Sequence, residues 1–107
     1  MNAPATPSRA VTVLVTRRVA PQGVAGFEAA MAGMIEAATH FPGHLGGQLV
    51  RPGESGGGDE PLLYHVVFAF DNEAHLAAWQ DSPERARWLA QVAPHTVGAQ
   101  EMRRVSG

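Results

Sequence analysis

The feature that most constrains the fold is the segment 63–70, LYHVVFAF, which is apolar on both faces of an extended chain. The larger side chains share one face, from Tyr64 to Phe70, while Val67 and Ala69 lie on the other. A strand of this kind needs cover on both faces of its sheet. The sequence therefore predicts helices against one face and a second protein surface, most simply another copy of the same sheet, against the other.

Further elements follow from periodicity and from turn residues. β-branched residues favour a strand that begins at Val11, and apolar residues at a 3.6-residue spacing favour a long helix from Val24. Asp71 or Asn72, and then Ser82, are the expected N-caps of two later helices. In chain order the predicted elements are a strand at 11–19, a helix from Val24 to near His40, a strand at 44–51, a glycine-rich loop at 52–60, the strand at 63–70, a short helix ending at Trp79, a helix from Pro83 that Pro94 stops, and a strand at 96–104.

The order β-α-β-β-α-α-β predicts an α+β fold with helices on one face of a four-stranded antiparallel sheet. A ferredoxin-like arrangement is the simplest topology that satisfies this order. The chain has 107 residues, which leaves room for a single core. We expect one domain over residues 10–105, preceded by a disordered tail at 1–9.

Composition excludes several classes of protein and of site. The chain has 8 basic and 10 acidic residues and a net charge of -2, which disfavours nucleic-acid binding. It contains no cysteine, so disulfides and thiolate metal sites are excluded, and its five histidines match no metal-ligand spacing. No segment suits a signal peptide or a membrane span. A soluble cytoplasmic protein without a bound metal is expected.

The aromatic residues are the most informative candidates for a ligand site. Phe27, Tyr64, Phe68, Trp79 and Trp88 are expected to converge between the helices and the sheet. Core packing alone accounts for most of this pattern. Two tryptophans in a small domain also suit a flat aromatic ligand, so both interpretations stay open.

Two polar residues border the same region. Arg17 is in step with Val13 and Val15, so it faces the helices if those valines do; there a cation would stabilise a phenolate or an enolate. The alternative is an ordinary surface arginine. His65 lies inside the most apolar strand and needs a partner, so it is either a structural histidine or one that faces a ligand.

A resemblance is carried by the segments 64–70 (YHVVFAF), 71–79 (DNEAHLAAW) and 81–85 (DSPER), and by the turn at 40–43 (HFPG). Over residues 11–100 the chain resembles the antibiotic biosynthesis monooxygenase family of the dimeric α+β barrel superfamily. This implies a homodimer of ferredoxin-like subunits whose sheets pair into a dimeric α/β barrel. Members include oxygenases that act on polycyclic aromatic phenols or quinols with O₂, without a metal or flavin cofactor.

Haem-degrading relatives have a tryptophan that matches Trp79, but their asparagine falls on Arg17 and their haem-ligating histidine on Leu89. The resemblance therefore favours a cofactor-independent monooxygenase of small aromatic substrates such as phenols, quinols or anthrones. The alternative is a non-catalytic dimeric ligand-binding or stress-associated module, whose core would be filled with side chains. The candidate catalytic residues are Arg17, Tyr64, His65 and Trp79, and the candidate substrate-binding residues are Phe27, Phe68 and Trp88.

Overall fold

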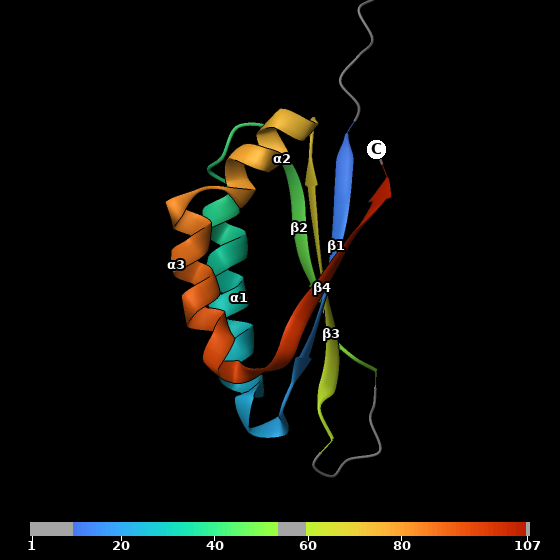
Figure 1. The fold of residues 1–107 in the computed structure, drawn as a ribbon, viewed down its shortest axis with the longest axis vertical. Coiled ribbons are helices and arrows are strands. Elements are labelled where there is room, and N and C mark those ends of the chain that lie inside the picture. The colour runs from blue at the N-terminus through green and yellow to red at the C-terminus, as the bar shows by residue number, and fades with distance from the viewer. Residues whose placement is uncertain (1–9, 54–59, 107) are drawn as a thin grey trace, which may run out of the picture.

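The computed structural model describes residues 10–53 and 60–106 (Figure 1). The predicted tail at 1–9 and most of the predicted glycine-rich loop, 54–59, lie outside the described residues. The elements are β1 (Val11–Val19), a 3₁₀ turn (Pro21–Gly23), α1 (Val24–Ala38), β2 (His44–Val50), β3 (Leu62–Phe70), α2 (Glu73–Gln80), α3 (Pro83–Val92), a second 3₁₀ turn (Ala93–His95) and β4 (Thr96–Ser106).

The four strands form one antiparallel sheet in the order β2-β3-β1-β4. The central pair, β1 and β3, is in register from Val11 opposite Phe70 to Val19 opposite Leu62. The three α-helices lie together on one side of this sheet, and no described element covers its other side (Figure 1). The predicted α+β fold with a ferredoxin-like topology is confirmed.

The core lies between the helices and the covered face of the sheet. Alternate residues of β3, from Tyr64 to Phe70, are buried there, and so is the apolar stripe of α1 from Phe27 to Ala38. This is the face that the larger side chains of residues 63–70 predict. Their burial anchors α1 across the middle of the sheet and fixes which β1 residues point toward the helices.

The uncovered side of the sheet, which we call the open face, is also apolar. Leu14 and Val67 are opposite one another on the central strands, and both are only partly buried. Val50, Leu63 and Val97 are exposed, the last two by 41% and 42%. In one chain this face keeps apolar surface in contact with water.

The helix starts agree with the predicted caps. Asn72 Oδ1 accepts the backbone N–H of His75 at 2.8 Å, and Ser82 Oγ accepts that of Arg85 at 3.0 Å. Each bond satisfies an N–H that the first turn of the helix leaves without a partner. Pro83 follows Ser82 at the first helical position, where its missing N–H costs nothing.

Three element ends differ from the prediction. The long helix ends at Ala38, because Thr39 and His40 already form a turn. Pro94 does not simply stop α3 but lies inside a 3₁₀ turn. The last strand continues to Ser106, since β4 pairs with β1 as far as Ser106 opposite Thr12.

Candidate functional site

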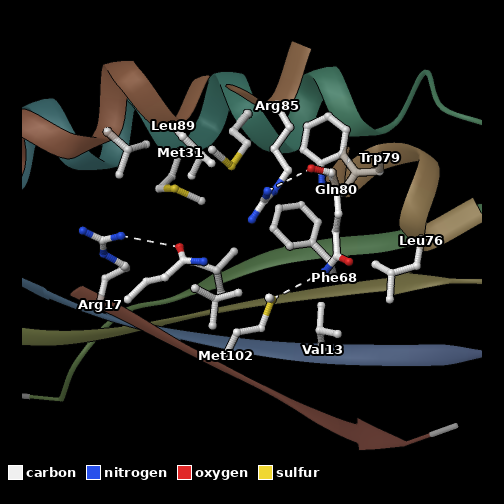
Figure 2. Close-up of a pocket in the computed structure, with 15 residues that line it drawn as sticks. Val13, Arg17, Met31, Phe68, Leu76, Trp79, Gln80, Arg85, Leu89 and Met102 are labelled. Carbon is white, nitrogen blue, oxygen red and sulfur yellow. Dashed lines mark hydrogen bonds between the residues drawn. The ribbon is translucent and has the colours of Figure 1, made fainter. Parts of the chain in front are cut away.

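A narrow pocket lies between the covered face of the sheet and the helices (Figure 2). Its walls are mainly apolar and include Val13, Met31, Phe68, Trp79 and Leu89. The cavity volume is about 30 Å³, which is space for roughly two water molecules. A cavity is therefore present between the helices and the sheet, but in this conformation it is too small for an aromatic ring.

Arg17 lies at one end of this pocket because β1 alternates. Val13, Val15 and Arg17 share the face toward the helices, and all three line the cavity. Opposite Arg17 the pairing of β1 with β4 shifts register. Within the shifted segment, Gly98 has a φ of +76°, a left-handed conformation that glycine adopts without strain.

This irregular stretch of β4 holds the Arg17 guanidinium. The group donates to Thr96 Oγ1 at 2.5 Å, to the Gly98 carbonyl at 3.3 Å and to Gln100 Oε1 at 3.4 Å. All three acceptors are neutral, and Arg17 Nε is buried without a hydrogen-bond partner among the described residues. Burial lowers the pKa of Arg17 from its ordinary value, and the side chain still carries a positive charge.

A second arginine, Arg85, lines the same pocket and is not among the predicted site residues. Figure 2 shows it reaching into the cavity from α3, on the opposite wall from Arg17. Its Nη1 donates to the Gln80 carbonyl at 3.0 Å, at the end of α2. Burial lowers the pKa of Arg85, and the charge of Asp81 opposes that effect.

The sequence does contain a signal for Arg85. It is four residues before Leu89 and seven before Val92, so all three share one side of a helix. Leu89 and Val92 also line the pocket. Leu89 and Val92 indicate the buried side of this helix, whereas a charged residue such as Arg85 is usually exposed.

Trp79 is at once a core residue and a wall of the pocket. Its side chain is 1% exposed. Its ring centroid is 5.0 Å from that of Phe41, edge to face, and 6.0 Å from that of Phe68. Phe68 and Trp79 thus form an aromatic corner beside Arg85 (Figure 2). Core packing and ligand contact are compatible at this position.

Methionine supplies much of the remaining wall. Three of the four methionines in the chain, Met31, Met34 and Met102, line the cavity. The Gln80 side-chain amide donates to the Met102 sulfur at 3.5 Å. Unbranched thioether side chains change rotamer at low cost, so this wall can move to admit a ligand larger than the present volume.

Of the seven predicted site residues, three line the pocket: Arg17, Phe68 and Trp79. The other four are not part of its lining. Phe27 is completely buried, with its ring centroid 4.8 Å from that of Tyr64. Trp88 packs beside Gly33 of α1.

Tyr64 faces the helices but is engaged outside the pocket. Its hydroxyl donates to Glu28 Oε2 at 2.6 Å. Arg51 donates to both oxygens of the same carboxylate, at 3.0 and 3.1 Å. Burial and the hydrogen bond to Glu28 raise the pKa of Tyr64 to about 12. Arg51 and Tyr64 together lower the pKa of Glu28. We call Glu28, Arg51 and Tyr64 the carboxylate clamp.

His65 lies on the open face, on the other side of the sheet from the pocket. Its Nδ1 is hydrogen-bonded to Thr16 Oγ1 across the strands at 3.1 Å. This bond supplies the partner that a histidine in an apolar strand requires.

Histidine and carboxylate groups meet only in pairs among the residues that the structure describes. His75 Nδ1 is 2.6 Å from Asp71 Oδ1, and His40 Nε2 is 3.3 Å from Glu36 Oε2. No cluster of three such side chains that could hold a metal ion is found in this part of the chain. Within the same residues, no helix is long and apolar enough to cross a membrane.

Fold and pocket together define a small α+β domain with an apolar open face and a cationic cavity. The model of the antibiotic biosynthesis monooxygenases matches residues 10–91. The chain belongs to this family. No curated protein sequence matches it.

Solved structures share the fold at low sequence identity. A protein from Nitrosomonas europaea, provisionally assigned to the same family, has a TM-score of 0.80 and 14% identity, covering 97% of this chain and 95% of its own. A conserved protein from Methanosarcina mazei has a TM-score of 0.78 and 16% identity, covering 90% of each chain. A variant of SnoaB, a cofactor-independent oxygenase from Streptomyces nogalater, has a TM-score of 0.75 and 14% identity, covering 94% of each chain.

Proposed function

We propose that this protein is a cofactor-independent monooxygenase that oxidises a small phenol, quinol or anthrone with O₂. Family membership and the likeness to SnoaB support the reaction class. The observation that carries the proposal is the pocket itself, where an aromatic corner lies together with Arg17, a partly buried cation that has no carboxylate partner among the described residues. The alternative, a non-catalytic ligand-binding or stress-associated module, would leave these compounds unchanged, either bound without reaction or excluded from a filled core.

The reaction needs no outside reductant. In an anthrone, the ring CH₂ group becomes a carbonyl. One atom of O₂ forms the new C=O bond, and the other leaves as water with the two hydrogens of the CH₂ group. The substrate first loses a proton to give an enolate, and the enolate then donates an electron to O₂. The protein's part is to hold the ring, exclude water and stabilise the anion.

Each part of the pocket has a place in this scheme. Phe68 and Trp79 would hold the aromatic ring, while the methionine wall moves to make space. Arg17 would donate its free Nε–H to the enolate oxygen, an interaction that low dielectric strengthens. Among the described residues, the lining contains no Asp, Glu or His. The substrate would therefore lose its proton to bulk water before it enters the pocket, and the rate should follow the acidity of the substrate.

The test is O₂ uptake with 1,8-dihydroxyanthrone, with the anthraquinone product quantified in parallel. One anthraquinone per O₂ is expected, at a rate well above that without protein. Arg17→Gln should lower kcat on the order of a hundredfold, because it removes the charge that stabilises the anion. Arg87→Gln is the matched control, since Arg87 is 71% exposed on the surface of α3. Binding without oxidation would contradict the proposal and favour the non-catalytic module.

We also propose that two copies pair through their open faces to form a homodimer. The exposed apolar residues of this face, among them Leu63 and Val97, support the pairing. Val67→Glu places a charge at the centre of the face and should yield monomers in light scattering, because a desolvated charge costs several kcal/mol, about 2–7 for even a neutral polar group. Ala90→Glu, on the exposed side of α3, should leave the mass unchanged. A wild-type monomer at micromolar concentration would contradict the dimer.

A further inference from the structure

The pocket holds two cations and no acid. Arg17 and Arg85 line it from opposite walls, and the described lining residues contain no Asp or Glu (Figure 2). The whole chain has a net charge of -2, so this local excess of positive charge runs against the overall balance. Such an arrangement favours an anionic ligand and attracts it into the cavity.

Of the five other arginines that the structure describes, three form ion pairs, while none is found for Arg18 or Arg103. Arg51, Arg87 and Arg104 each contact a carboxylate, those of Glu28, Glu84 and Glu73 respectively. The two pocket arginines instead bond to neutral acceptors. Partial burial of a cation without a full ion pair is costly, so the pocket arginines are expected to gain from a ligand that supplies a negative charge; at Arg85 the nearby charge of Asp81 offsets part of this cost.

The free hydrogen-bond donors of the two arginines differ in number. Arg17 uses both terminal nitrogens on β4 and leaves Nε, which suits a single oxygen atom. Arg85 uses Nη1 on the Gln80 carbonyl. Its Nε and Nη2 form the guanidinium edge that pairs with both oxygens of a carboxylate, and no hydrogen bond from that edge to a described residue is found, although the charge of Asp81 acts on the group.

We propose that the substrate is an aromatic acid, whose carboxylate pairs with Arg85 while its ionised ring oxygen meets Arg17. This inference rests on the proposed function, because it assigns the substrate class of the same pocket. Arg85 is then the residue that determines specificity for the acid. The ring between the two anionic groups lies against Phe68 and Trp79.

The experiment compares three probes that share one ring system: 2-naphthol, 2-naphthoic acid and 6-hydroxy-2-naphthoic acid. Dissociation constants are measured by calorimetry on the wild type, Arg85→Gln and Arg87→Gln. The hydroxy acid should bind the wild type at least about tenfold more tightly than 2-naphthol, as expected for a charge-assisted bidentate pair. Arg85→Gln should abolish this preference and leave 2-naphthol affinity within about twofold. Arg87→Gln, which removes the same charge from the solvent side of α3, should keep the preference.

The possible outcomes distinguish the aromatic-acid inference from the proposed monooxygenase function. Equal affinity of the wild type for 2-naphthol and the hydroxy acid overturns the inference and leaves the proposed monooxygenase standing. A uniform loss of affinity for all three probes in Arg85→Gln also overturns it, since that is the result of a merely structural bond to Gln80. An Arg85-dependent acid preference without oxidation of any anthrone carboxylic acid supports Arg85 as the carboxylate-binding residue, contradicts the proposed function and leaves the acid a ligand and not a substrate. No binding of any probe overturns both.

Discussion

The carboxylate clamp and the pocket both lie where helices meet the sheet, but they differ in how their charged side chains are paired. In the carboxylate clamp, Glu28 accepts from Arg51 and from the Tyr64 hydroxyl, so charge is neutralised within the protein. In the pocket, the hydrogen bonds that Arg17 and Arg85 make to described residues go to neutral acceptors. A completed ion pair therefore indicates a structural role. Arg17, which has no charged partner among the described residues, leaves its strongest interaction for a ligand, whereas the charge of Asp81 offsets part of the charge of Arg85.

The largest expected effect comes from the aromatic corner of the pocket. Trp79→Ala should lower the free energy of unfolding by about 3–5 kcal/mol, because a completely buried ring is removed. Trp79→Phe keeps a large ring and should retain the fold while weakening aromatic ligands. Chemical denaturation measures the first effect, and ligand titration the second. If Trp79→Phe bound aromatic ligands as tightly as the wild type, Trp79 would be a core residue only.

The clamp should contribute to stability and not to binding. Tyr64→Phe should lower the free energy of unfolding by about 1–2 kcal/mol, because it removes a buried hydroxyl bonded to a carboxylate. Affinity for 6-hydroxy-2-naphthoic acid should stay within about twofold of the wild type. A tenfold loss of affinity in this variant, with the fold intact, would place Tyr64 in the binding site. The clamp would then not be purely structural.

The clamp should also make stability depend on acid pH. The pKa of Glu28 is lowered in the folded protein, by Arg51 first and by Tyr64 second, from an ordinary 4.5. Its contribution is present above pH 4.5 and is lost as the pH falls through the folded value. Denaturation at a series of pH values should therefore show a weaker decline below pH 4.5 in Glu28→Gln than in the wild type. If the free energy of unfolding declined equally below pH 4.5 in both proteins, protonation of Glu28 would not affect stability.

The smallest effect on the free energy of unfolding is expected for substitution of Arg17. Arg17→Gln should change the free energy of unfolding by less than about 1 kcal/mol, because relief of the desolvated charge offsets the lost hydrogen bonds. The same denaturation series measures it. A loss of several kcal/mol would make Arg17 a structural anchor of β4 and remove the contrast with the clamp.

Periodicity and capping chemistry predict most of the fold. The two-faced strand at 63–70 indicates both the helix side and the open face, and Asn72 and Ser82 mark helix starts because their caps depend on local sequence alone. The site is predictable only in part. Arg17 follows from the alternation of β1, whereas the irregular pairing around Gly98 that holds it depends on contacts more than seventy residues apart.

The same limit applies to Arg85 and Tyr64. A charged residue near a helix start is usually exposed, and only the tertiary arrangement turns Arg85 inward. Tyr64 shares the covered face with Phe68, but its hydroxyl meets Glu28 of α1, a contact that local patterns do not specify. Sequence reasoning thus places residues on faces, while long-range packing selects which of them share a cavity.

We expect Arg17 to stabilise an ionised oxygen on the ligand. This is tested most directly by the pKa of the ring hydroxyl of bound 6-hydroxy-2-naphthoic acid, followed by absorbance titration. An uncompensated cation stabilises the ionised oxygen, so the wild type should lower this pKa by at least about one unit relative to the free ligand. Arg17→Gln should return it to the free value or above. A raised pKa of the bound hydroxyl in the wild type is the result expected of an apolar cavity without an available cation. It would show that Arg17 does not stabilise the ionised oxygen.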